Sequence, residues 1–371
     1  MKKLLWILLL LFPLAVRAEG SYSLPGRTIV DYAILDEHNV AAKCWEDAEG
    51  SVGLPWHLTW WRDGEILRDI PYDPADSGNY MLIPQPGGGC AVLVREDDGG
   101  TFPVSTGFAP WDTGRASLYA WTDAGLADAR EIAAGILDGK PTENGFGLML
   151  YENGKVYLAL YDGQGNREAR IEMEPGVNTL VRAVRDGDGL WVATVHDRSK
   201  GNDYRLLVIR EGQTVWQGEP SGLPHAAYAD GRGGYFITAR LSQKNAYSPV
   251  SVSRYDGYGK RLWKKEISGK KVAVGALPRL DAETGRLILI GTAWANSRDV
   301  RLVYRLEADE KGKTLGLDVR ECPGGEDTAV AVYTAEDGRV WLLLRSFDGE
   351  PARMLPFEEL PAGENPGLKL K

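Results

Sequence analysis

The chain has 371 residues, of which 43 are basic and 52 are acidic, so its formal net charge is −9 at neutral pH. This acidic balance argues against nucleic acid and anionic membrane surfaces as partners, because both require a basic footprint. After the first residues, no stretch is long and apolar enough to form a membrane helix. We therefore expect no insertion into a membrane and no binding of nucleic acid.

The first 18 residues have the pattern of a secretory signal peptide. Lys2 and Lys3 form a basic start, residues 4–11 form a short apolar run, and Ala18 is a small residue at the cleavage position. Cleavage after Ala18 leaves residues 19–371 as a single domain. It removes three basic residues and no acidic one, which moves the formal charge from −9 to −12. The residue directly after the cleavage site is Glu19 and not a cysteine, so we expect a secreted or periplasmic protein without a lipid anchor.

A short motif recurs along the chain and consists of an acidic or polar residue, a glycine and then an apolar run. It occurs at residues 152–155, 186–189 and 336–339, before Val156, Leu190 and Val340 respectively. The glycine suits a hairpin turn, because such turns need a positive φ. Recurrence at intervals of about 50 residues is typical of a β-propeller, whose blades are four-stranded antiparallel sheets. The sequence therefore predicts an all-β protein.

One blade can be identified almost completely within residues 226–267. Its predicted strands are 226–229, 235–239, 250–255 and 262–267, separated by turns rich in glycine. Applied to the chain in order, this template predicts a seven-bladed β-propeller of four-stranded antiparallel blades. The predicted blades are 28–67, 80–121, 146–173, 179–217, 226–267, 272–321 and 328–360.

The boundaries of the second and third blades are blurred, so six or eight blades stay open as alternatives. The third blade is short by one strand. Residues 124–137 have weak helix signals interrupted by Gly125 and Gly135, and we interpret them as an edge strand running into a loop. A ring must join its two ends, so residues 21–30 should pair with the last blade or pack against it.

The three cysteines, Cys44, Cys90 and Cys322, allow at most one disulfide within the chain. A bridge between Cys44 and Cys90 would join adjacent blades. The simpler interpretation is that Cys44 is a small buried residue on a strand. Spacing alone does not decide between them, because a disulfide requires a specific distance.

Residues 255–263, from Tyr255 to Trp263, resemble the repeat of quinoprotein-type (PQQ-like) propellers, in which an Asp, a Gly-Lys turn and a Trp close each blade. Residues 211–216 are a partial copy. The resemblance implies that Trp263 docks onto the neighbouring blade. Enzymes of that family need a quinone, a calcium ion, a catalytic Asp and commonly a vicinal disulfide. This chain has no adjacent cysteines and no clear calcium ligands, so the resemblance implies a scaffold member without cofactor or metal.

Candidate binding residues are expected in the loops where the second and third strands of the blades are joined, since loops vary freely on a rigid scaffold. The candidates are Trp56, His57, Asp97, Asp98, Trp111, His196, Asn245 and Trp294. Exposed Trp side chains could stack on sugar rings or on a protein surface. Most of the 12 Trp residues are expected instead to pack between blades, most clearly Trp191, Trp216, Trp263 and Trp341.

No catalytic or metal-binding motif accompanies these candidates. None of the four His residues has the spacing of a metal ligand pair, and His196 and Asp197 should point to opposite faces of a strand. The sequence therefore favours an exported, monomeric, non-catalytic propeller that binds a protein or glycan partner. The alternative is a carbohydrate-active hydrolase or lyase that uses two loop carboxylates, whose proximity sequence spacing cannot reveal. A quinoprotein dehydrogenase is the weaker alternative.

Overall fold

The computed structural model describes most of the chain after residue 20. The described ranges are 21–46, 56–72, 80–85, 87–96, 114–142, 145–185, 189–197, 203–220, 222–230, 232–241, 249–269, 272–274, 277–280, 284–295, 300–322, 328–335, 337–346 and 351–371. Regular structure in these ranges is β, apart from the 3-10 helix η4 (Phe357–Glu359). Within them, no helix has the length and apolar character needed to cross a membrane. The leader and its cleavage site lie outside the described residues.

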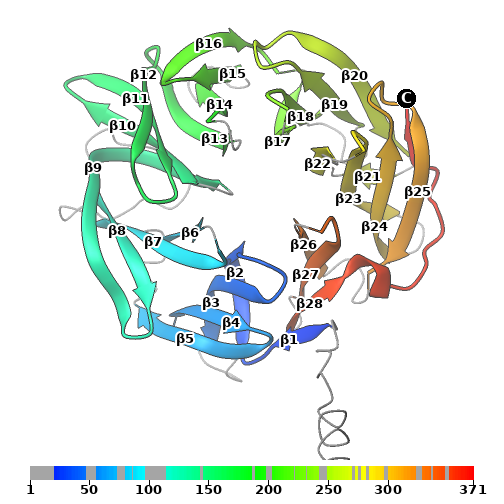
Figure 1. Ribbon diagram of the computed structural model, residues 1–371, viewed down its shortest axis with the longest axis horizontal. Helices are drawn as coiled ribbons and strands as arrows, with labels where there is room; N and C mark the ends of the chain where they lie inside the picture. The colour runs from blue at the N-terminus through cyan, green and yellow to red at the C-terminus, as the bar shows by residue number, and fades with distance from the viewer. Residues whose placement is uncertain are drawn as a thin grey trace, which may run out of the picture.

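The described strands form six antiparallel sheets arranged in a ring, with strands such as β2, β6, β13, β17 and β26 toward the centre (Figure 1). This arrangement is a β-propeller. The first three sheets in chain order comprise β2 (Arg27–Ile34), β3 (Asn39–Glu46), β4 (Trp56–Arg62) and β5 (Glu65–Tyr72); then β6 (Tyr80–Gln85), β7 (Gly89–Glu96), β8 (Gly114–Thr122), β9 (Gly125–Thr142), β10 (Gly145–Glu152), β11 (Lys155–Asp162) and β12 (Arg167–Glu172); then β13 (Val177–Arg185), β14 (Trp191–Asp197), β15 (Asp203–Arg210) and β16 (Gln213–Gly218).

The remaining three sheets complete the ring, and two of them include strands from the ends of the chain. They comprise β17 (Leu223–Ala229), β18 (Tyr235–Arg240), β19 (Val250–Tyr255), β20 (Arg261–Ser268) and β29 (Lys369–Leu370); then β21 (Val272–Val274), β22 (Leu277–Leu280), β23 (Leu287–Ala295), β24 (Val300–Ala308) and β25 (Thr314–Glu321); then β26 (Thr328–Thr334), β27 (Val340–Ser346), β28 (Ala352–Pro356) and β1 (Tyr22–Leu24). The strands predicted within 226–267 are confirmed as β17 to β20.

The prediction of seven separate four-stranded blades is wrong. Five sheets are separate blades of four or five strands, whereas the region of the second and third predicted blades is one continuous seven-stranded sheet. The cause is the 18-residue strand β9, which pairs with β8 on one side and with β10 on the other. Ile136 pairs with both Gly114 and Leu150, so one strand closes the first half of this sheet and opens the second.

Strand β9 also explains why the third predicted blade looked short by one strand. Residues 124–137, interpreted as an edge strand leading into a loop, are instead part of this strand and continue without a loop to Thr142. Gly135 has a φ of +73°, and a Cβ there would collide with the backbone oxygen of Tyr151. Gly135, which weakened the helix pattern, therefore allows a positive φ and a close approach of the Tyr151 backbone within a long bent strand.

The two ends of the chain close the ring, as predicted. Strand β1 pairs antiparallel with β28, with Leu24 opposite Ala352, and thereby becomes the outer strand of the last blade. Leu24 is fully buried in a cluster shared with the first blade. The C-terminal residues then run back along the periphery, where Ala362 bridges to Arg320 and β29 pairs with β20 (Figure 1). The tail thus covers the outer edges of the two preceding blades.

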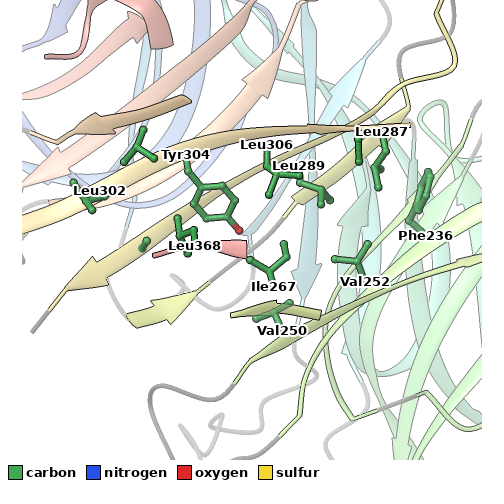
Figure 2. Packing of buried hydrophobic residues seen from close by; sticks show 13 residues of the cluster. Phe236, Val250, Val252, Ile267, Leu287, Leu289, Leu302, Tyr304, Leu306 and Leu368 are labelled. Atoms are coloured by element: carbon green, nitrogen blue, oxygen red, sulfur yellow. The ribbon is translucent and has the colours of Figure 1, made fainter. Parts of the chain in front are cut away.

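Apolar side chains hold neighbouring sheets together face to face. Phe236 and Val252 of one blade pack in a cluster with Leu289 and Tyr304 of the next, and Leu368 of the C-terminal tail joins them (Figure 2). These clusters recur around the ring because each strand of a blade presents alternate residues to either side. Burial of these faces is the main source of stability in such a ring, where each blade packs mainly on its neighbours.

Trp residues dock blades together, as the sequence predicted. The indole nitrogen of Trp263 donates to the backbone oxygen of Glu310 at 2.9 Å, in the turn between β24 and β25 of the next blade. Trp191 and Trp341 are each only 1% exposed, and Trp216 packs against the neighbouring apolar cluster. These indoles therefore serve inter-blade packing.

All three cysteines are buried and none is in a disulfide. The possible bridge between Cys44 and Cys90 is therefore wrong, and the simpler interpretation of Cys44 as a buried strand residue is confirmed. The reason lies in the alternation of the strands. Cys44 belongs to the cluster facing the last blade, whereas Cys90 belongs to the cluster between the first blade and the seven-stranded sheet.

Substitutions of two turn glycines provide a test of the predicted hairpin turns. Gly338 and Gly259 have φ of +82° and +81°, but a Cβ on Gly338 would meet open space whereas one on Gly259 would collide with the Trp216 ring. Gly338→Ala should lower the free energy of unfolding by about 1 kcal/mol through backbone strain alone, and Gly259→Ala by at least about twice that. Urea unfolding of both variants measures the two losses in free energy. Equal losses would contradict the close contact between Gly259 and the Trp216 ring of the preceding blade.

Ring closure can be tested at β1. Leu24→Ala should lower the free energy of unfolding by about 3 kcal/mol, because it removes a fully buried side chain and leaves a cavity. Val30→Ala is the matched control, since Val30 is 41% exposed on the next strand and should cost less than about 0.5 kcal/mol. If Leu24→Ala unfolds like the control in denaturant, the β1–β28 pairing contributes little to stability.

Candidate functional site

The structure describes only part of the predicted site. Asp97, Asp98, Trp111 and Asn245 lie outside the described residues. Trp294 lies on β23, and its side chain is not among those described. Trp56 and His57 start β4, and His196 lies near the end of β14, in a different blade. Of the candidates whose side chains are described, only Trp56 and His57 are neighbours, and they are adjacent in one strand.

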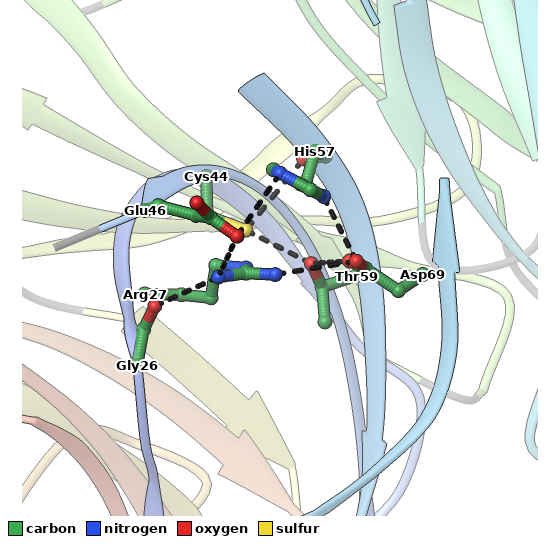
Figure 3. A network of polar contacts seen from close by, with 7 residues as sticks. All are labelled: Gly26, Arg27, Cys44, Glu46, His57, Thr59 and Asp69. Atoms are coloured by element: carbon green, nitrogen blue, oxygen red, sulfur yellow. Dashed lines mark hydrogen bonds and ion pairs between the residues drawn. The ribbon is translucent and has the colours of Figure 1, made fainter. Parts of the chain in front are cut away.

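His57 belongs to a polar network at one end of the first blade (Figure 3). Its Nδ1 lies 2.8 Å from Asp69 Oδ2, and since a carboxylate only accepts, Nδ1 carries the proton. Thr59 Oγ1 donates to Asp69 Oδ1 at 2.7 Å, and Arg27 Nη2 donates to Asp69 Oδ2 at 3.2 Å. Asp69 on β5 is thus held by three donor side chains, two from β4 and one from β2.

The second half of the network involves Glu46 at the end of β3. Arg27 Nη1 lies 2.9 Å from Glu46 Oε1, so this guanidinium bridges Glu46 and Asp69. His57 Nε2 is buried without a hydrogen bond and lies 3.6 Å from Glu46 Oε1. An imidazolium at this position would therefore be flanked by the same two carboxylates. The side chain of Glu46 is 40% exposed, whereas that of His57 is only 9% exposed.

The register of the first blade explains why these residues meet. Cys44 is directly opposite His57, and Thr59 is directly opposite Asp69, so all four side chains share one face of the sheet. This face packs toward the last blade, in the cluster that contains Cys44 and Leu24. Cys44 Sγ lies 3.1 Å from Thr59 Oγ1 but is fully buried, which makes the thiol structural and inaccessible to a substrate.

The opposite face of the same blade carries a row of aromatic side chains, which we call the aromatic row: Trp45, Trp56, Tyr72 and Tyr80. Trp45, Trp56 and Tyr72 are consecutive cross-strand partners on β3, β4 and β5. Ring centroids are 5.2 Å apart for Trp45 and Trp56 and 6.1 Å for Trp56 and Tyr72. Tyr80 on β6 continues the row at 4.8 Å from Tyr72. All four rings are half-buried.

Burial also controls the chemistry of the aromatic row. It raises the pKa of Tyr72 above its ordinary value, which keeps this phenol neutral well beyond physiological pH. The row extends from the first blade onto the seven-stranded sheet, where Tyr72 and Tyr80 pack against the apolar cluster between the two sheets. The half-buried faces of such rings can stack against a flat apolar group.

His196 has a structural environment. Its ring stacks on Tyr204, its cross-strand partner on β15, with centroids 4.4 Å apart and an interplanar angle of 13°. Asp197 is fully buried and, as the next residue in the strand, points to the other face, as predicted. In the described part of the chain, no group of three His, Cys, Asp or Glu side chains is placed to hold a metal ion.

Sequence reasoning missed most of this site. It identified Trp56 and His57 but not their partners, namely Arg27, Trp45, Glu46, Thr59, Asp69, Tyr72 and Tyr80. The signal that could have found them is the alternation of polar and aromatic residues within 56–60 and 68–72, which predicts two chemically different faces. Which of these residues meet still depends on strand register.

Comparison with known proteins finds similar structures and assigns no activity. No family model matches the chain. It is similar to the β-propeller domain of the Trilobed protease from Pyrococcus furiosus, with 12% identity, a TM-score of 0.48 and coverage of 88% of this chain and 96% of that one. For the acylaminoacyl peptidase of Pyrococcus horikoshii the identity is 12%, the TM-score 0.48 and the coverage 88% and 52%, so the chain spans about half of that peptidase.

TolB from Acinetobacter baumannii is a further similar structure, with 15% identity, a TM-score of 0.36 and coverage of 85% of this chain and 79% of that one. Identities and TM-scores this low assign no role to this chain. The activities of the two peptidases therefore assign nothing to the residues of this chain.

The polar network predicts unequal roles for its two carboxylates. Asp69→Ala should lower the free energy of unfolding by about 2 kcal/mol, because three donors from His57, Thr59 and Arg27 lose their acceptor. Glu46→Ala is the control and should cost less than about 1 kcal/mol, since its side chain is 40% exposed. Denaturant unfolding of both variants measures this, and a larger loss for Glu46→Ala would contradict the assignment.

Proposed function

We propose that the protein is an exported, non-catalytic binding module that engages a protein or glycan partner through the aromatic row of the first blade. The observation that carries this proposal is the row itself, formed by Trp45, Trp56, Tyr72 and Tyr80 as half-buried rings at successive cross-strand positions. Export is inferred from the basic start, apolar run and small residues of the first 18 positions.

Rigidity supports a role in binding. Trp56 is anchored on a strand whose next residue, His57, is fixed by Asp69 on the other face, so the ring has little freedom to lose when a partner binds. Preorganised aromatic groups give affinity at low entropic cost, and Trp and Tyr dominate many binding surfaces for this reason. The C–H face of a sugar ring or an apolar patch of a protein would stack on such rings.

A glycan array and a binding assay with the captured ligand test this proposal. Trp56→Ala should weaken binding at least about tenfold, because a central aromatic anchor is removed. Tyr258→Ala is the matched control: it removes an aromatic ring that is 71% exposed in the β19–β20 turn, away from the row, and should leave binding unchanged. Circular dichroism establishes that both variants are folded.

Two outcomes would contradict the proposal. Binding that survives Trp56→Ala in a folded protein would exclude the aromatic row as the site. Cleavage of an arrayed glycan by the wild-type protein would replace the binding module with a carbohydrate-active enzyme.

A further inference from the structure

Two pairs of arginine and tyrosine side chains lie on strands near the centre of the ring, away from the aromatic row. Arg182 on β13 pairs with Tyr228 on β17, and Arg345 on β27 pairs with Tyr32 on β2. Strands β2, β13 and β17 are the inner strands of their sheets, and β27 is next to the inner strand β26 (Figure 1).

Each guanidinium is held by an aromatic ring. Arg182 Nη2 donates to the hydroxyl oxygen of Tyr228 at 3.1 Å, and Arg182 Cζ lies 5.4 Å from the Tyr228 ring centroid. Arg345 Cζ lies 4.7 Å from the Tyr32 ring centroid, and its Nη1 donates to the backbone oxygens of Ile29 and Val30 at 3.5 and 3.3 Å. Stacking on a ring orients a guanidinium and leaves its other donors available.

Neither guanidinium pairs with a carboxylate in the part of the chain that the structure describes. Acidic residues outnumber basic ones in the protein as a whole. On the outer strands, Arg170 also stacks on a tyrosine, Tyr157, but is paired with Glu152. Arg345 Nε is in addition buried without a hydrogen-bond partner. Pairing with an anion stabilises a partly buried cation more than it stabilises an exposed one.

Both arginines act electrostatically on Tyr32, which lies on the inner strand β2. Burial raises the pKa of Tyr32, Arg345 and Arg182 both oppose this shift, and Asp31 adds to it. Arg182 and Arg345, from different sheets, are therefore within electrostatic range of one phenol, which stays neutral and can donate a hydrogen bond. The neighbouring acid, Asp31, is neutralised by Lys43, whose Nζ lies 2.9 Å from its carboxylate.

We propose that Arg182, Arg345 and Tyr32 form a binding site for an oxyanion, the carboxylate or phosphate group of a small ligand, at the centre of the ring. Two guanidinium groups supply the charge and the forked donors that carboxylates and phosphates prefer. The phenol of Tyr32 supplies a further neutral donor. The site is separate from the aromatic row and does not depend on its function.

Calorimetric titration of the protein with sodium phosphate and, separately, with sodium citrate tests the site. Sodium chloride at matched ionic strength corrects for general screening. At least one of the two anions should bind saturably. Arg182→Gln and Arg345→Gln should each weaken that binding about tenfold, as expected for the loss of one charge-assisted hydrogen bond. Binding of phosphate only, or of citrate only, identifies the preferred group.

Arg170→Gln is the matched control, because it also removes a guanidinium stacked on a tyrosine, but one that already has a carboxylate partner. It should leave anion binding unchanged. Arg345 also bonds to the backbone of β2, so its loss affects the fold as well as the site. If Arg345→Gln does not fold, anion binding is measured instead with Arg345→Lys, which keeps the charge. The proposal is overturned if neither anion binds the wild-type protein, or if the Arg182 and Arg170 variants lose binding equally.

Discussion

The pairing of β1 with β28 is the contact on which the rest of the structure depends, because it holds the first blade against the last. Leu24 ends β1 and is fully buried, and β2 starts only three residues later at Arg27. Chain continuity therefore forces the inner strand of the first blade to lie beside the last blade. Arg345 crosses that boundary to the backbone oxygens of Ile29 and Val30. Both the polar network and one arginine–tyrosine pair consequently lie where the ring closes.

The strand register of the first blade separates two kinds of chemistry. Trp56 and His57 are neighbours in the chain, yet one joins the aromatic row and the other joins a network of charges on the opposite face. The network supports the row, because it fixes the strand that carries Trp56. Aromatic rings held on a strand that hydrogen bonds fix from the other face suit binding, in which preorganisation lowers the entropic cost.

Acidic residues outnumber basic ones in the protein as a whole, and arginines such as Arg170 on β12 and Arg185 at the end of β13 have carboxylate partners. Near the centre, Arg182 and Arg345 rest on tyrosine rings instead. A cationic centre within an acidic molecule would attract small anions while the surface repels polyanions.

The sequence by itself determined the local elements. Strands β17 to β20 follow the predicted template, since alternation and turn glycines act over a few residues, and the docking of Trp263 onto the next blade follows from its place in the repeat. Tertiary structure decided the rest. Whether β9 ends one blade or joins two, and whether His57 meets Asp69, depends on hydrogen-bond register between distant segments. Register and ring closure are set by packing across the whole chain, which no local pattern encodes.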